Sequence, residues 1–142
     1  MTEISPSLKF FLNLAKVQTV LARRFDLGLG GLGFSDFVIL FHLSQVRDER
    51  LRRVDLAEKV GLTASGVTRL LAPMEKVGLI KRETTEHDAR VSYVRLAPGG
   101  KGKLAEALED AELLAEELIS KEKAKNIVDL SQILVDLGGV IK

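Results

Sequence analysis

The chain has 142 residues, a length that suits one domain or a small domain with an added interface element. Hydrophobic residues make up 46% and charged residues 29%, which is typical of a globular chain, and the net charge of +1 by itself predicts no polyanionic partner. The absence of cysteine excludes disulfides, zinc fingers and thiol chemistry.

The first residues lack the basic region and long apolar core of a secretory signal. No apolar run approaches the roughly 20 residues that a membrane span needs. We therefore expect a cytoplasmic protein that does not enter a membrane.

Residues 5–27 are predicted to form a helix with apolar side chains on two sides. A helix with two apolar faces must bury both, and one small domain rarely covers both by itself. The glycine-rich run 28–33 then ends this helix. The two faces consist of Leu8, Phe11, Leu12 and Ala15, and of Phe10, Leu14, Val17 and Leu21.

Ser35 is the predicted N-cap of a second helix, which runs to about Val46. His42 lies on this helix, and we expect it to be a partly buried residue of the helix face. The charged connector Arg47–Arg53 follows, in which Leu51–Arg53 could add a short strand to a neighbouring sheet.

Two shorter helices, Asp55–Val60 and Thr63–Val77, are predicted on either side of a glycine turn. Gly61 permits a left-handed turn without a Cβ clash, and the small Ala57 lets the later helix approach closely. Val67 packs back on the earlier helix. This spacing is typical of a helix-turn-helix.

The later helix carries its own start and stop signals. Thr63 is the predicted N-cap and Gly78 the C′ residue, while Pro73 removes one backbone hydrogen bond and should bend the helix. Three polar side chains lie in its exposed N-terminal part: Ser65, Thr68 and Arg69.

Alternating residues predict a two-stranded hairpin, Ile80–Thr84 and Val91–Leu96, which would stand beside the helices as a wing. The alternation predicts that Arg82 and Arg95 both face outward. A helix that fits the major groove beside a basic hairpin that fits the minor groove is an arrangement that reads double-stranded DNA.

A long helix is predicted after Pro98-Gly99-Gly100, and a final helix follows it. Both carry apolar stripes that a winged domain alone does not need. We therefore expect helices from the two ends of the chain to pair with those of a second copy, in a homodimer. The stripes consist of Leu104, Ala107, Leu108, Ala111, Leu114, Ala115 and Leu118, and of Ile127, Leu130, Leu134 and Leu137.

The predicted fold is mainly α with a small β-wing: a winged helix-turn-helix flanked by N- and C-terminal dimerisation helices. Its parts are residues 1–34 (N-terminal helix and linker), 35–98 (DNA-binding domain) and 99–142 (C-terminal helices). Charge favours this assignment, because Arg50–Arg95 holds ten Lys/Arg against six Asp/Glu, whereas Lys101–Lys142 holds six against nine.

With these elements in place, the chain resembles a MarR-family transcriptional regulator over nearly its whole length. The resemblance rests on Leu56-Ala57, Val67–Leu70, Glu75–Ile80 and Arg82, and on the wing residues Asp88, Arg90, Val94, Leu96 and Gly100. Two residues depart from the family pattern: Ala89, where many relatives have arginine, and Ala97, where threonine is usual and would cap the long helix.

The resemblance implies a homodimer that binds pseudo-palindromic operators, usually as a repressor that a small ligand relieves. It implies that Arg90 enters the minor groove and that Asp88 orients Arg90. Thr63 acts mainly as the N-cap, although with Ser65 it also places hydroxyls and free N–H groups where a phosphate could bind. Arg69 contacts either a base edge or a phosphate, and Lys81, Arg82 and Arg95 either contact phosphates or are solvated.

Other motifs suggest different functions. The GxGxxG match at residues 28–33 follows a helix instead of the strand that a dinucleotide site requires, so it is better read as a linker. The cluster Glu83, Glu86, His87 and Asp88 lies on one hairpin without a second set of ligands, so we expect no metal, cofactor or enzymatic activity. His42 lies in the region that lines the ligand pocket in related proteins and is a candidate effector contact. The alternative function is a dimeric winged-helix interaction module without operator binding.

Overall fold

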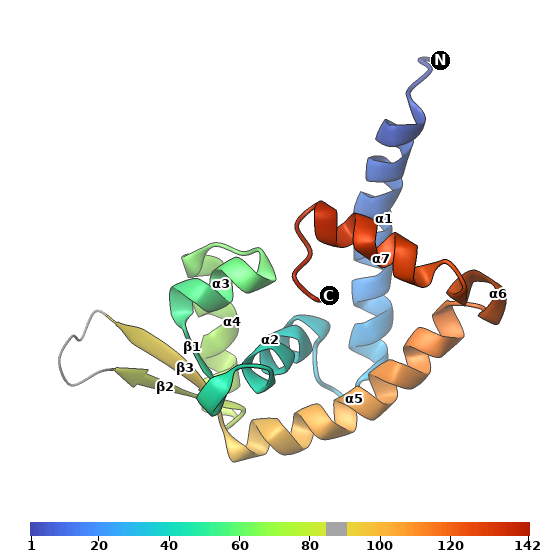
Figure 1. Cartoon of the computed structure of the whole chain (residues 1–142). Coiled ribbons are helices and arrows are strands. Elements are labelled where there is room, and N and C mark those ends of the chain that lie inside the picture. Colours follow the sequence, from blue (N-terminus) through green and yellow to red (C-terminus); the bar gives the residue numbers. More distant parts are fainter. Residues whose placement is uncertain (85–90) are drawn as a thin grey trace.

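A computed structural model describes residues 1–84 and 91–142. Within these ranges the chain is mostly helical with one small sheet (Figure 1). The helices are α1 (Pro6–Gly28), α2 (Phe34–Ser44), α3 (Arg53–Val60), α4 (Ala64–Lys76), α5 (Pro98–Leu118), α6 (Lys121–Ala124) and α7 (Ile127–Asp136), and the strands are β1 (Arg50–Arg52), β2 (Ile80–Thr84) and β3 (Ser92–Leu96).

Helices α2, α3 and α4 and the sheet gather at one end of the molecule, and α5 runs from the base of the sheet towards α6 and α7 (Figure 1). The sheet is antiparallel in the order β1-β3-β2, so β3 lies in the middle. The buried core joins these elements, because it takes Leu40 from α2, Leu56 from α3, Leu71 from α4 and Val94 from β3, all fully buried. The predicted winged helix-turn-helix is confirmed.

The start of α2 differs from the prediction. Gly33, not Ser35, is its N-cap, and the helix begins at Phe34. The missing side-chain cap is supplied from α1, because the Phe34 N–H donates to Asp26 Oδ1 at 2.7 Å. The Asp26 carboxylate, eight residues before Phe34, therefore caps the start of α2, a role that the sequence suggested for Ser35.

The start of α5 also differs. The helix begins at Pro98, so Gly99 and Gly100 belong to its first turn and do not precede it. Ala97 is the N-cap and provides no side-chain hydrogen bond, as its residue type requires. Strand β1 lies one residue earlier than expected, since Arg53 already begins α3.

Arg82 and Arg95 lie on opposite faces of the sheet. The prediction that alternation turns both side chains away from the core is therefore wrong for Arg82. The register pairs Arg82 with Val94, whose side chain is in the core, and pairs Arg95 with Lys81. The sequence contained a signal for this face, because the apolar residue Ile80 stands two positions before Arg82. In the structure Ile80 is buried, and Arg82 lies on the same face of β2. Arg82 nevertheless remains exposed, because it lies beyond Ile80 towards the far end of the strand.

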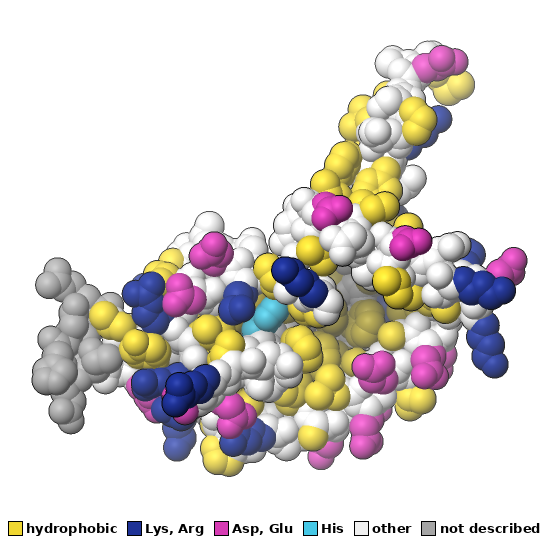
Figure 2. Space-filling view, in the orientation of Figure 1, with side chains coloured by type: hydrophobic (Ala, Val, Ile, Leu, Met, Phe, Trp, Pro, Cys, Tyr) yellow, Lys and Arg dark blue, Asp and Glu magenta, His cyan; other side chains and the backbone are white. Residues whose placement is uncertain are grey.

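The terminal helices leave much apolar surface uncovered within one chain. Neither α1 nor α7 contains a buried residue. Helix α1 projects from the body and carries hydrophobic side chains along its length, and more gather over the neighbouring α7 (Figures 1 and 2). The exposed set includes Leu8, Phe10, Phe11, Leu12, Val17 and Val20 on α1, and Ile127, Val128, Leu130, Ile133 and Leu134 on α7. None of the helices described is both long and apolar enough to cross a membrane.

Candidate nucleic-acid interface

Helices α3 and α4 meet at the predicted glycine turn. Gly61 has a left-handed backbone with φ of 72°, and the Leu62 N–H donates to the Ala57 carbonyl at 3.0 Å. Ala57 and Val67 are both buried where the helices approach each other. This packing holds the exposed side of α4 at a constant angle to the rest of the core.

Thr63 caps α4 as predicted. Its Oγ1 accepts the Gly66 N–H at 3.0 Å, and the Ser65 hydroxyl lies 3.3 Å away. Ser65 and Arg69, one helical turn apart, are both exposed on α4. These two side chains therefore lie on the accessible surface of the helix that a DNA groove would receive.

Thr68 has a different position from its neighbours. Its hydroxyl accepts a hydrogen bond from Arg53 Nη1 at 2.7 Å and donates one to the Ala64 carbonyl at 2.9 Å. The side chain thus joins the first residue of α3 to α4. Sequence reasoning missed this contact, because no local pattern brings residues 53 and 68 together.

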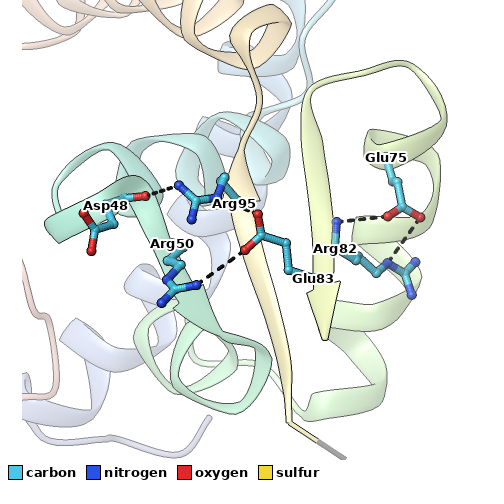
Figure 3. Close-up of polar contacts among 6 residues, drawn as sticks. All are labelled: Asp48, Arg50, Glu75, Arg82, Glu83 and Arg95. Carbon is cyan, nitrogen blue, oxygen red and sulfur yellow. Dashed lines mark hydrogen bonds and ion pairs between the residues drawn. The ribbon is translucent and has the colours of Figure 1, made fainter. Parts of the chain in front are cut away.

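Arg82 reaches from β2 back to α4. Glu75 accepts the backbone N–H of Arg82 at 3.1 Å through one carboxylate oxygen, and its other oxygen lies 3.5 Å from the Arg82 Nε (Figure 3). The Arg82 guanidinium is therefore held at the junction of helix and wing, although its side chain remains about one third exposed.

On the opposite face of the sheet, Glu83 lies between two arginines (Figure 3). Its carboxylate accepts from Arg95 Nε at 2.7 Å and lies 3.5 Å from Arg50 Nη1. The hydrogen bond from Arg95 lowers the pKa of the Glu83 carboxyl, and Arg50 lowers it further. Arg50 also stacks on the Tyr93 ring, with its Cζ 4.6 Å from the centroid.

Asp88 and Arg90 lie outside the described residues, as do Glu86 and His87. Of the predicted contacts, the described part of the chain therefore places Ser65 and Arg69 together on α4, Thr63 at the N-cap, and Thr68 and Arg82 in contacts within the domain.

The family model that describes the MarR family matches residues 30–91. This range runs from the glycine-rich loop after α1 through α2, the helix-turn-helix and β2. The solved structure of the transcriptional regulator BldR from Sulfolobus solfataricus superposes with a TM-score of 0.79 and is 28% identical, over 96% of this chain and 99% of BldR. Over residues 30–91, and in its overall fold, this chain is therefore similar to MarR-family regulators.

Two curated proteins of Bacillus subtilis (strain 168) are also similar. The HTH-type transcriptional repressor YetL is 29% identical over 104 residues, and the HTH-type regulator YdgJ is 25% identical over 95 residues. The alignments cover 72% and 65% of this chain, but only 62% and 55% of the length of YetL and YdgJ.

Two more distant solved structures extend the comparison. Sco3205 of Streptomyces coelicolor, solved in complex with DNA, has a TM-score of 0.73 at 19% identity, over 96% of this chain and 91% of Sco3205. The organohalide-sensing RdhR-CbdbA1625, solved with 2,4-dichlorophenol, has a TM-score of 0.79 at 21% identity, over 94% of this chain and 80% of that protein. At these identities the likeness establishes the shared fold.

An apolar pocket of about 300 Å³ lies between the winged helix-turn-helix and the terminal helices. Its lining combines four phenylalanines with aliphatic residues and one acid, Glu112. The phenylalanines are Phe25 from α1 and Phe34, Phe37 and Phe41 from α2, and the aliphatic residues include Leu108 and Ala111 from α5. His42 is 7% exposed and does not line this pocket. Burial lowers the pKa of His42, and nearby Lys59 lowers it further.

The described residues contain no group of three or more His, Cys, Asp or Glu that could hold a metal ion. The glycine-rich run 28–33 joins α1 to α2, and no strand precedes it in the part of the chain that the structure describes.

Proposed function

We propose that the protein is a homodimeric transcriptional regulator that binds pseudo-palindromic operators, most simply as a repressor relieved by a small ligand. The observation that carries this proposal is the exposed pair Ser65 and Arg69 on α4, beside a wing whose base is rich in arginine. A helix and hairpin so arranged fit adjacent grooves of DNA. That Sco3205 was solved in complex with DNA supports the proposal.

Within this proposal the residues have separate roles. Ser65 and Arg69 face the major groove, and Thr63 presents the N-terminus of α4 to a phosphate. Thr68 supports the groove-facing surface through its bonds to Arg53 and Ala64, and Arg82 contacts the DNA backbone near the wing. Arg90, oriented by Asp88, enters the minor groove; both lie outside the described residues.

The second copy of the chain would cover the apolar faces of α1 and α7. A single chain leaves these faces open, although burial of such surface stabilises a protein by about 25 cal/mol per Å². Two-fold pairing would place the two α4 helices about 34–36 Å apart, or a multiple of that spacing, to match successive turns of DNA.

The effector would be a small apolar or aromatic molecule. The phenylalanine-lined pocket between α1, α2 and α5 offers suitable walls, and 2,4-dichlorophenol is the ligand bound to RdhR-CbdbA1625. His42 is proposed as an indirect contributor at most, because it is buried on α2 and does not line the pocket.

Mobility shift and fluorescence anisotropy with duplexes tiled across the region upstream of the gene test the proposal. We expect a retarded complex whose affinity falls severely in Arg90→Ala and in Arg69→Ala. Arg23→Ala, an exposed arginine on α1, serves as the charge-matched control and should bind normally. The absence of any complex, also with a randomised duplex pool, would instead favour a dimeric winged-helix interaction module.

A further inference from the structure

The connector turn between α2 and β1, Arg47–Glu49, has an unfavourable backbone. Asp48 and Glu49 are adjacent, neither is glycine, and their φ angles are 59° and 52°. Left-handed conformations are costly for residues with a Cβ and persist only where surrounding contacts hold them. The contacts of this turn should therefore reveal what holds it.

Two cations hold the turn from two different elements. Arg95 Nη1, on β3, donates to the Asp48 carbonyl at 3.0 Å, and Lys101 Nζ, on α5, lies 2.6 Å from Glu49 Oε1. The turn is thus fastened to the middle strand of the sheet and to the first turns of the long helix.

The Arg95 side chain also makes a hydrogen bond through its Nε. Its Nε donates to Glu83 on β2 at 2.7 Å, and the second oxygen of Glu83 faces Arg50 on β1 (Figure 3). One guanidinium therefore bonds to the connector turn and to β2 together, while one carboxylate bonds to β1 and β3. All three strands and the turn are joined through three side chains, those of Arg50, Glu83 and Arg95.

We propose that Arg95 and Glu83 are positioning residues for the wing: they set the direction in which the hairpin leaves the helix-turn-helix, and Arg95 does not serve as a phosphate contact. This inference rests on the proposed DNA-binding function, because the wing direction matters only if the wing enters a groove.

The geometry of the guanidinium explains why position 95 needs an arginine. Its planar guanidinium donates from Nε and Nη1 in different directions, so it can bridge two acceptors at once. A lysine keeps the positive charge but presents a single ammonium on a flexible stem. A phosphate contact tolerates that exchange far better than a bridge does.

A substitution of Glu83 distinguishes the proposed positioning role from a purely electrostatic effect on DNA binding. Removing an acid near DNA should strengthen binding to the negatively charged backbone. If Glu83 positions the wing, Glu83→Gln weakens binding to the preferred sequence instead. The two explanations thus predict opposite signs for one substitution.

The experiment measures the affinity of the purified full chain for a duplex selected by the wild type from a randomised pool, and for an unselected duplex of equal length. We expect Glu83→Gln and Arg95→Lys each to lose about tenfold in affinity for the selected duplex, with little change for the unselected one. Glu58→Gln, an exposed acid on α3, is the matched control and should not weaken binding. General unfolding would lower both affinities alike.

Tighter binding by Glu83→Gln, or wild-type affinity in Arg95→Lys, would overturn the proposal. A wild type that binds no duplex would defeat the proposed function instead. Hydrogen exchange without DNA then tests the Glu83 contacts independently of binding. The amides of β1 and β3 should exchange faster in Glu83→Gln than in Glu58→Gln. Equal exchange rates in the two variants would overturn the positioning role.

Discussion

Gly100, in the first turn of α5, lies directly against the backbone carbonyl of Leu79. A Cβ on Gly100 would clash with the Leu79 oxygen and stand 2.9 Å from Leu96 Cδ1. The same carbonyl accepts the Ala97 N–H at 3.1 Å. This close approach seats the long helix on the start of the wing, which is why glycine stands inside the helix despite its low helix propensity.

Gly100→Ala should be strongly destabilising, because the methyl group meets backbone atoms that cannot move independently of β2. We expect a loss of about 3 kcal/mol in the free energy of unfolding, at the upper end of overpacking effects. Gly102→Ala is the control, since a Cβ at that position would have open space within 4 Å, and it should gain up to about 1 kcal/mol. Urea titrations measure both; similar values for the two variants would contradict the close approach.

Substitution of Thr63 should affect stability, whereas substitution of Ser65 should affect DNA binding. Thr63→Ala removes the N-cap bond to Gly66 and should cost about 1 kcal/mol in chemical denaturation. Ser65→Ala should leave stability unchanged while it weakens operator binding. If Ser65→Ala unfolds as early as Thr63→Ala, the hydroxyl of Ser65 is structural instead.

The salt dependence of binding should identify the partner of Arg69. Each phosphate neutralised contributes about −0.9 to the slope of log K against log salt concentration. Because Arg69 is exposed in the middle of α4, we expect it to contact a base edge. Arg69→Gln should then relax sequence preference and leave the slope unchanged. A shallower slope with intact sequence preference would assign Arg69 to a phosphate.

His42 should make stability depend on pH. Burial lowers its pKa from the ordinary value of 6.5, with Lys59 adding to the effect. The unfolded chain therefore binds a proton more readily than the folded one, so His42 lowers the free energy of unfolding as the pH falls through 6.5. Thermal melts should show a steeper decline in Tm for the wild type than for His42→Gln between about pH 8 and pH 5.5. Parallel declines would show that His42 does not contribute.

The open face of α1 should control assembly. Phe11 is 46% exposed in the single chain, so Phe11→Glu would place a charge in the proposed dimer interface. We expect light scattering to give a dimer mass for the wild type and a monomer mass for the variant. Gln18→Glu, at an exposed polar position of the same helix, should remain dimeric. A wild-type monomer mass at all concentrations would contradict the proposed homodimer.

The predictions that succeeded rest on short-range rules. Thr63 as an N-cap, Gly61 as a left-handed turn and the hairpin strands each depend on residues a few positions apart. Of those that failed, one depended on a more distant residue and the other on a local alternation that was assigned to the wrong face. Ser35 lost the cap position because Asp26 of α1 reaches Phe34, and Arg82 lies on the core side of its strand because that face continues from buried Ile80.

The sequence by itself determined the order and approximate extent of the main helices and strands, because caps, glycine turns and apolar periodicity act locally. Only the tertiary structure decided the partners of Arg53 and Arg95. Arg95 and Asp48 are 47 positions apart, and Arg53 and Thr68 are 15 apart, yet each pair is hydrogen-bonded. The physical reason is that a guanidinium extends far from its backbone, so its partner depends on which elements the packed core brings within reach.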